Sequence, residues 1–563
     1  MSKYTENFPN LSTYDFDKIL CQLGRVCGGD TSGLINAQFL SRPTTAKDIA
    51  QLFYCTYEIM KTSKSLQDQF VELYNFVKDF FTNLDLQNEV NNWLDNALES
   101  GKLVQIFNQK ETTIYSDYIN VIDLGVKNDG SDMSNKLQQI LNIHKNLFFP
   151  AGVYSFKNVQ LDENVKIKGF NCIFNPIKID ENSNNLYPMF ISNDFNEIEI
   201  KDINIISEII IDNTNPVTQT SIFEFTNGTR VLFKNVSFKN ISNRNQNTKD
   251  LFEERKGSCI TVKDTNFIII DSCRYFNIDG NEINYICPYN NDRKSINIIF
   301  SNNYAENVNS TLLDFLGNKC EIFNNEYNFN YAGSLLNIFG LYVYIHDEVI
   351  LSDAGSVYDC TEDGFFSSNI IDIRNVYIDS NIRNIGIYAF CDQINIENYI
   401  HKNGNRSLQI YNATNTNKIS KFQATETKTK ISVNISNSYT NSNNFIRSAN
   451  PIENYYINVE NCDINTKKQN FYTKDGILKI NKSILYNFNG NQSSLPYCIE
   501  SVSDHIIKML FITNSNIIPI NSQQQERLLM GKVSNGLCIG NIKAGVQSEL
   551  GTNLQGFANI GYN

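Results

Sequence analysis

The sequence predicts a mainly β protein, a right-handed single-stranded parallel β-helix preceded by an α-helical N-terminal stalk. Short alternating apolar runs are split by Asn, Asp, Ser or Gly, and matching positions recur at Asp314, Asn337 and Asp359, 23 and 22 residues apart. A period in the twenties made of strands is typical of a stacked solenoid. Each coil would bury its apolar faces against neighbouring coils about 4.8 Å away.

Composition supports a long core and excludes some classes of function. Apolar residues make up 41% of the 563 residues, and more than one folding unit is expected. The net charge of −12 argues against nucleic-acid binding, which favours a basic surface. The 13 Cys include no CxxC pair and mostly sit in apolar runs, so we expect buried thiols rather than disulfides or zinc ligands. No cofactor is expected.

The start of the chain predicts neither export through a signal peptide nor membrane insertion. The first residues lack the apolar core of a secretory signal. No run approaches the roughly 18 apolar residues that a membrane span needs.

The first 118 residues are expected to be an arm followed by a helical stalk. Residues 1–43 alternate aromatic residues with turn formers, which indicates an attachment arm. Residues 44–118 carry apolar residues at helical spacing. Leu66, Phe70 and Leu73, for example, are four and three residues apart, as in a heptad pattern. We favour an oligomeric stalk because this apolar stripe has little local partner; an intramolecular helical hairpin is the alternative.

The entry to the solenoid has its own pattern. A strand is followed by a turn at Asp129-Gly130, a short amphipathic helix over residues 134–142, a strand over residues 146–149, and the sequence Pro150-Ala-Gly-Val-Tyr. This order resembles the entry segment of the pectate-lyase-like superfamily of parallel β-helices, as found in bacteriophage tailspikes. The resemblance implies that the helix caps the open end of the solenoid, where a bare first coil would expose its interior.

The preceding helical stretch carries the resemblance further. Residues 74–95 resemble the helical segment before the β-helix in phage tail spike and preneck appendage proteins, so the likeness covers roughly residues 65 to 170. It implies a homotrimeric virion component, assembled in the host cytoplasm and docked on phage tail or neck proteins through residues 1–43. Residues 119–545 would be the receptor-binding or depolymerase β-helix and residues 546–563 a C-terminal tail.

The same resemblance implies a function. The β-helix is expected to bind a host surface polysaccharide, capsule or teichoic acid, and the interpretation favours cleavage by a hydrolase or lyase. The alternative is a non-catalytic structural or adhesive appendage. A cellular polysaccharide lyase is a weaker alternative, because the stalk and the missing signal peptide count against it.

Carboxylates are the residues best suited to carry chemistry. Asp314 and Asp359 lie two predicted coils apart, or about 9.6 Å, and side-chain lean could bring them into the ~6.5–9.5 Å range of an inverting glycosidase. Flanking apolar residues such as Phe315 could keep one acid protonated. Asn337 between them would hold a sugar hydroxyl, and Glu224, in a similar strand context, is a third candidate catalytic carboxylate. The alternative is that this column is only a structural ladder.

Two further polar groups lie at predicted turns. Glu362 and Asp363 are expected to contact substrate; with Asp347 and Glu348 they form an acidic patch for which a Ca²⁺ site is an alternative. A second column predicts an amide and carboxylate ladder that closes backbone hydrogen bonds, and His346 falls beside it in a structural role. The members of this column are Asn235, Asp271, Asn302, Asn325, Asp347, Asn375 and Asn398.

Overall fold

The computed structural model describes residues 117–557, apart from internal stretches of which the longest are 208–220, 243–254, 411–419, 488–496 and 544–553. These residues belong to the second of two compact units into which the chain divides, residues 115–563. The predicted arm, and the predicted stalk up to residue 116, lie outside the described residues.

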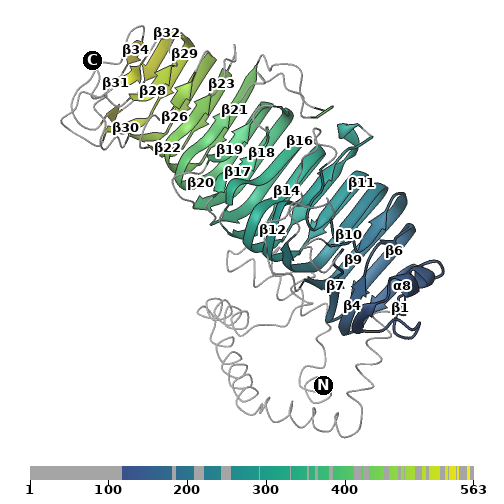
Figure 1. The fold of residues 1–563 in the computed structure, drawn as a ribbon. Helices are drawn as coiled ribbons and strands as arrows, with labels where there is room; N and C mark the ends of the chain where they lie inside the picture. Colours follow the sequence, from purple (N-terminus) through teal and green to yellow (C-terminus); the bar gives the residue numbers. More distant parts are fainter. Residues whose placement is uncertain are drawn as a thin grey trace, which may run out of the picture. The chain divides into compact units, whose positions relative to one another are not determined.

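The described strands pair in parallel with strands of the next coil and form three sheets that run along the stack. Strands that turn a corner contribute to more than one sheet, such as β14 (Tyr304–Phe323), which contributes to all three. Figure 1 shows the strands following one another in chain order along the stack, from β1 to β34. This arrangement is a parallel β-helix, as the repeat predicts.

The first sheet contains β1 (Ile119–Asn120), β3 (Asn146–Phe149), β6 (Glu163–Gly169), β9 (Phe195–Ile206), β10 (Phe223–Ser242), β11 (Ile260–Asp271), β13 (Asn297–Ser301), β14, β16 (Tyr331–Ile350), β18 (Ser368–Asp379), β20 (Cys391–Ile410), β21 (Ile431–Ser436), β23 (Tyr455–Glu460), β26 (Gly476–Asn481), β29 (Ile506–Thr513), β32 (Lys532–Ile539) and β34 (Leu554–Phe557).

The second sheet adds β2 (Asp129–Asp132), β4 (Gly152–Phe156), β7 (Cys172–Pro176), β12 (Arg274–Cys287), β15 (Glu326–Asn328), β22 (Tyr439–Ser448), β24 (Asp463–Thr466), β27 (Ile484–Asn487), β30 (Asn516–Pro519) and β33 (Ile542–Lys543). The third adds β5 (Val159–Gln160), β8 (Phe190–Ser192), β17 (Ala354–Asp359), β19 (Ile385–Ala389), β25 (Phe471–Thr473), β28 (Tyr497–Ser501) and β31 (Arg527–Met530).

The lumen is filled by columns of apolar side chains, one residue from each coil. In the first sheet Ile200, Phe233, Ile270 and Phe300 are in register on successive coils, and all four are fully buried. Alternate residues of a strand point to opposite faces, so the alternating pattern in the sequence sends this column inward. Each such side chain contributes roughly 1.5–3 kcal/mol when buried.

A short helix lies at the N-terminal end of the stack. Helix α8 (Ser134–Leu141) lies beside β1 at the start of the solenoid (Figure 1), within the range predicted for it. Leu137 is buried, and the Gln138 side chain bonds both backbone groups of Gln160. The Ser134 hydroxyl accepts a hydrogen bond from the backbone N–H of Lys157. The helix is therefore fastened to the first coils by both apolar and polar contacts.

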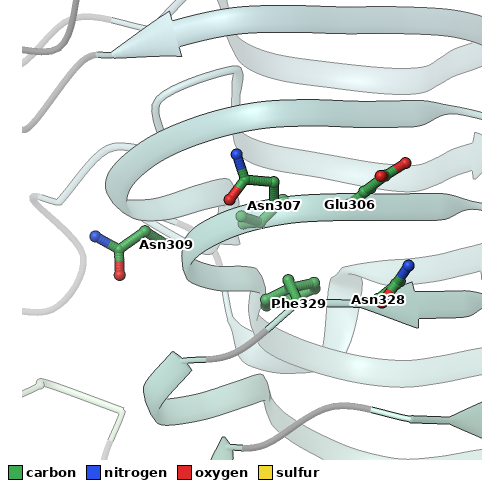
Figure 2. Close-up of a pocket in the computed structure, with 6 residues that line it drawn as sticks. Glu306, Asn307, Asn309, Asn328 and Phe329 are labelled. Carbon is green, nitrogen blue, oxygen red and sulfur yellow. The ribbon is translucent and has the colours of Figure 1, made fainter.

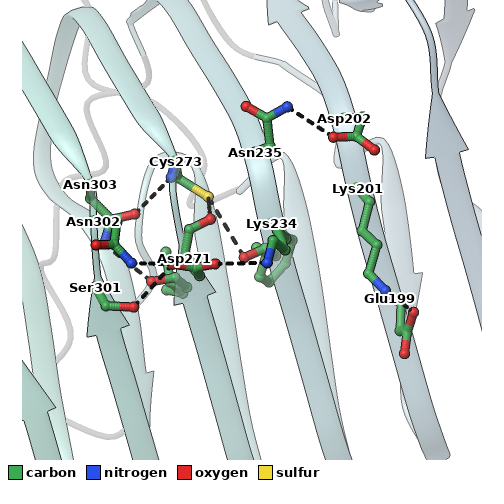
Figure 3. Close-up of polar contacts among 12 residues, drawn as sticks. Glu199, Lys201, Asp202, Lys234, Asn235, Asp271, Cys273, Ser301, Asn302 and Asn303 are labelled. Atoms are coloured by element: carbon green, nitrogen blue, oxygen red, sulfur yellow. Dashed lines mark hydrogen bonds and ion pairs between the residues drawn. The ribbon is translucent and has the colours of Figure 1, made fainter. Parts of the chain in front are cut away.

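A ladder of left-handed residues marks the corner between the first and second sheets. Positive φ angles occur at five members of the predicted turn column. They are Asn235, Asn302, Asp347, Asn375 and Asn398. Amide side chains bond the previous coil, as from Asn235 to Asp202 (2.8 Å) and from Asn302 to Asp271 (2.7 Å), both visible in Figure 3. Asn and Asp tolerate this conformation better than other residues that carry a Cβ.

Two members of the predicted column lie one position away from the left-handed residue. In one coil the residue with the positive φ is Ser272, so Asp271 lies one position before it. In another coil it is Asn324, so Asn325 lies one position after it. Asn325 belongs instead to a buried ladder: it bonds the backbone N–H of Asn303 (2.8 Å) and the carbonyl of Phe300 (3.1 Å). The corner thus carries two ladders, one exposed and one inside.

The eight cysteines whose side chains the structure describes are free and buried, as expected. Burial raises the pKa of Cys172 and Cys273 to about 12, so both stay protonated at neutral pH. Within the same residues, no helix is long and apolar enough to cross a membrane.

Candidate functional site on the outer face of the third sheet

Asp314, Asn337 and Asp359 lie in direct register on three successive strands. Asp314 of β14 pairs with Asn337 of β16, which pairs with Asp359 of β17. The coil spacing read from the sequence therefore gives the observed alignment. The column continues in both directions through residues that the sequence analysis did not join to it. These are Thr261 and Tyr285 on one side, and Tyr388, Gln409 and Arg447 on the other.

The column faces away from the lumen. Leu313 and Phe315 pack in the main core, so Asp314 between them points to the outer face of the sheet. Tyr285, in register with Asp314, belongs to a separate apolar cluster on that face. The column position is therefore external to the solenoid.

A second apolar layer covers this outer face. Its buried members are Tyr285, Cys287, Leu316, Phe339, Phe365 and Phe366, with Phe422 packed against them. Arg293, in the 3₁₀ turn η2 (Arg293–Ser295), lies over the Phe366 ring at 5.8 Å and donates to the carbonyls of Gly317 (3.2 Å) and Phe339. Burial lowers the pKa of Arg293 to about 9.

Asp314, on the same face, is fully buried. Burial raises the pKa of its carboxyl well above the usual range, and the charges of Glu282 and Asp359 raise it further. Arg255 and a hydrogen bond from Asn337 act in the opposite direction. The Asn337 amide is 3.5 Å from Asp314 Oδ2, and Asp314 Oδ1 has no hydrogen-bond partner in the part of the chain that the structure describes. Burial and the acidic neighbours therefore favour the protonated form of Asp314.

Glu282 and Arg255 were not predicted as members of this site. Glu282 is almost fully buried, and its Oε1 lies 3.9 Å from Nη1 of Arg255. The pairing of β12 with β14 shifts between Asp279 and Glu282, so a fixed repeat length misses this position. Arg255 lies before β11, outside the strands, so the strand repeat does not predict its position.

Asp359 and Asn337 are the more accessible members of the column. Asp359 is 9% exposed, and its Oδ1 accepts hydrogen bonds from the backbone N–H (2.8 Å) and hydroxyl (3.1 Å) of Thr361. Asn337 is half-buried. A ligand on this face would meet these two side chains before Asp314.

Glu224 lies in the same column but apart from the acids. Three steps separate it from Asp314, through Thr261 and Tyr285, which is about 14 Å. Its carboxylate is engaged by Lys256 (2.6 Å) and by the backbone N–H of Ser221 (2.8 Å). The structure does not bring it together with Asp314 and Asp359.

The predicted acidic patch is divided where the structure describes it. Asp347 is an exposed member of the corner ladder, whereas the next residue, Glu348, is fully buried in the lumen. Glu362 and Asp363 lie outside the described residues. Among the residues with a defined position, no group of three His, Cys, Asp or Glu side chains could hold a metal ion. His346 stacks on Phe323 at 4.9 Å.

Comparison with known proteins returned no matching family model and no matching curated protein. Several solved structures resemble the chain at low identity. Tailspike protein 3 of bacteriophage CBA120 has a TM-score of 0.34 and 9% identity, over 80% of this chain and 62% of that one. The chain thus spans less than two thirds of that tailspike.

Two further structures are similar to the chain. The catalytic unit of the GH87 α-1,3-glucanase from Streptomyces thermodiastaticus has a TM-score of 0.27 and 10% identity, over 79% of this chain and 69% of that one. PfbA, a surface adhesin of Streptococcus pneumoniae, has a TM-score of 0.28 and 11% identity, over 79% and 92%. The chain is therefore similar to a phage tailspike, a glucanase and an adhesin, with identities of 9–11%.

Proposed function

We propose that this chain is a phage tail spike or appendage protein whose β-helix binds and cleaves a host surface polysaccharide, a capsule or a teichoic acid. The observation that carries the proposal is the line of acid, amide and acid at Asp314, Asn337 and Asp359 on the outer face of the third sheet. The sequence resemblance of residues 65–170 to tail spike and preneck appendage proteins supports the same class of function.

The chemistry proposed for the site is general acid–base catalysis. Asp314, kept protonated by burial and by its acidic neighbours, would donate a proton to the leaving oxygen of a glycosidic bond. Asp359 would act as the base, and Asn337 would hold a hydroxyl between them. Two coils separate the acids by about 9.6 Å at the backbone, which leaves room for a water molecule. A sugar contacts Asp314 only when the side chains that cover it move aside.

Further contacts and assembly belong to the same proposal. Glu362 and Asp363 would bind the glycan beside Asp359. Residues 44–118 would form a trimeric stalk, and residues 1–43 would attach the protein to a tail or neck component of the virion. Sedimentation equilibrium of the full chain should give three times the monomer mass of 64.4 kDa; a monomer at micromolar concentration contradicts the stalk assignment.

The test of cleavage uses a panel of purified bacterial capsular polysaccharides and teichoic acids. Size-exclusion chromatography should show one of them shortened by the wild type and left intact by Asp314→Asn and Asp359→Asn, which keep shape and remove the carboxyl group. Glu224→Gln is the matched control from the same column and should cleave normally. Full activity in both Asp variants would show that Asp314 and Asp359 are not catalytic and have only a structural role.

The second candidate function is adhesion without cleavage, which the complete burial of Asp314 favours. It predicts a glycan that binds with unchanged chain length, and binding that survives Asp314→Asn. The same panel therefore separates the two functions.

A further inference from the structure

A surface hollow lies near the turn from the second sheet to the third, between β14 and β15. Its volume is about 560 Å³. Its lining residues are Glu306, Asn307, Val308, Asn309, Asn328 and Phe329, five of them labelled in Figure 2. Asn309 precedes Asp314 by five residues on the same strand, at most about 17 Å. The hollow is therefore a separate place on the coil that carries the candidate acids.

The amides that line the hollow use their N–H groups on the protein. Asn307 Nδ2 donates to Asn277 Oδ1 (2.7 Å), and Asn277 donates in turn to Asn240 (3.0 Å). Asn309 Nδ2 donates to Asp279 Oδ1 (3.1 Å) on the previous coil. Each of these amides thus uses one of its two N–H groups on the protein and presents its carbonyl oxygen as an acceptor beside the second N–H. In the described part of the chain, the Asn240–Asn277–Asn307 ladder ends at this hollow.

Glu306 and Asn328 also present acceptor oxygens to the hollow. The Tyr304 hydroxyl donates to Glu306 Oε2 (2.9 Å), and the Asn328 side chain donates to the Tyr304 oxygen. Glu306 thus keeps one oxygen for a ligand, and Asn328 keeps its carbonyl. Val308 and Phe329 are buried and form an apolar part of the lining. The hollow combines one negative charge and several acceptors with apolar carbon.

A ligand that fits must bring donors and positive charge. Sugar hydroxyls can donate to the carbonyl oxygens, and sugar C–H groups can rest on apolar carbon. A primary ammonium would pair with Glu306 by a charge-assisted hydrogen bond. We propose that this hollow binds an amino-sugar residue with a free amino group. The inference rests on the proposed polysaccharide-binding function and adds a recognition site that does not depend on catalysis by Asp314.

The test measures binding of two oligosaccharides of equal length by titration calorimetry in slightly acidic buffer. Chitosan tetraose carries free ammonium groups, and its N-acetylated counterpart, chitotetraose, does not. Wild-type protein should bind chitosan tetraose more tightly. Glu306→Gln should weaken that binding about tenfold and leave chitotetraose binding unchanged. Because the Glu306 side chain is exposed and Gln has the same shape, the variant should fold normally. Thermal melting checks this.

Two controls separate the site from general charge effects and from the candidate acids. Glu397→Gln removes an exposed charge on β20 of the first sheet and should leave chitosan binding intact. Asp314→Asn should also leave chitosan binding intact, whether or not the wild-type protein cleaves a polysaccharide. Equal binding by wild type and Glu306→Gln overturns the proposal. So does equal weakening by Glu397→Gln, or a hollow that takes up millimolar Ca²⁺ and no chitosan tetraose.

Discussion

Two carboxyl groups in this protein, Glu348 in the lumen and Asp314 on the outer face, are both fully buried. Burial is the largest cause that raises the pKa of each, to about 8 for Glu348 and well above the usual range for Asp314. By burial and pKa alone the two acids look alike.

Their hydrogen bonds differ. Oε1 of Glu348 accepts from the backbone N–H (2.9 Å) and the side-chain amide (2.8 Å) of Asn325, so it extends the buried ladder by one coil. Among the described residues, Asp314 has a single hydrogen-bond contact, at 3.5 Å with Asn337, and it lies near the acidic side chains of Glu282 and Asp359. Each acid also has one buried oxygen without a hydrogen-bond partner among the described residues, Oε2 of Glu348 and Oδ1 of Asp314. What distinguishes the two acids is that Glu348 accepts two bonds from Asn325 and so serves the fold, whereas Asp314 lies among other acids.

Removal of the lumen acid should have the largest effect on stability. Glu348→Ala leaves two donors of Asn325 without an acceptor and opens a cavity, which should cost about 3–5 kcal/mol. Glu348→Gln keeps an acceptor oxygen and should cost less than about 1 kcal/mol. Urea midpoints of the two variants measure the difference. An alanine variant as stable as the wild type would show that the ladder does not need this rung.

The pH dependence of stability should be the next largest effect. The folded state holds protons on Glu348 and Asp314 at pH values where the unfolded chain has released them. Stability from these groups is therefore full below pH ~4.5 and is lost as pH rises toward about 8, the raised pKa of Glu348. Between pH 5 and pH 8 the free energy of unfolding of the wild type should fall by several kcal/mol, which thermal melts at each pH can measure. Glu348→Gln should flatten the slope more than Asp314→Asn if the lumen acid dominates; a flat wild-type curve contradicts both shifts.

The exposed corner ladder should matter less than the buried one. Asn375 bonds Asp347 (2.9 Å) and accepts from Asn398 (3.0 Å) at a positive φ. Asn375→Ala should cost about 1–2 kcal/mol, since it loses both bonds and places in the left-handed conformation a residue that tolerates it less well than Asn. Asn375→Gly loses the same bonds without that strain and should be less harmful in the same urea titration. Equal losses of stability in the two variants would show that the hydrogen bonds, and not the left-handed backbone, set the cost.

The outer acid should show the smallest stability effect. Asp314→Asn is isosteric and removes a carboxyl whose Oδ1 has no partner, so stability should change by less than about 1 kcal/mol. Cleavage of the substrate polysaccharide, by contrast, should fall by at least about 100-fold. A large loss of stability with normal cleavage would make Asp314 a fold residue like Glu348.

Much of the fold and part of the site follow from local sequence. Strict alternation sends Phe233 and Ile270 inward and leaves Asp314 facing outward, because side chains alternate along a strand. The spacing of 23 and 22 residues sets the register of Asp314, Asn337 and Asp359, because each strand pairs with its counterpart one coil away. Left-handed corner residues were placed to within one position, since Asn or Asp stands at two neighbouring positions of several corners.

The environment of Asp314 was decided only by the tertiary structure. Glu282 reaches the site after a register shift, and Arg293 contacts Phe339, 46 positions further along the chain. Phe365, Phe366 and Phe422 cover the outer face from segments that do not share the coil period. Periodicity reports only contacts between equivalent positions of adjacent coils. The apolar layer on this face joins coil strands to irregular segments that pack across coils, so the repeat in the sequence does not encode it in full.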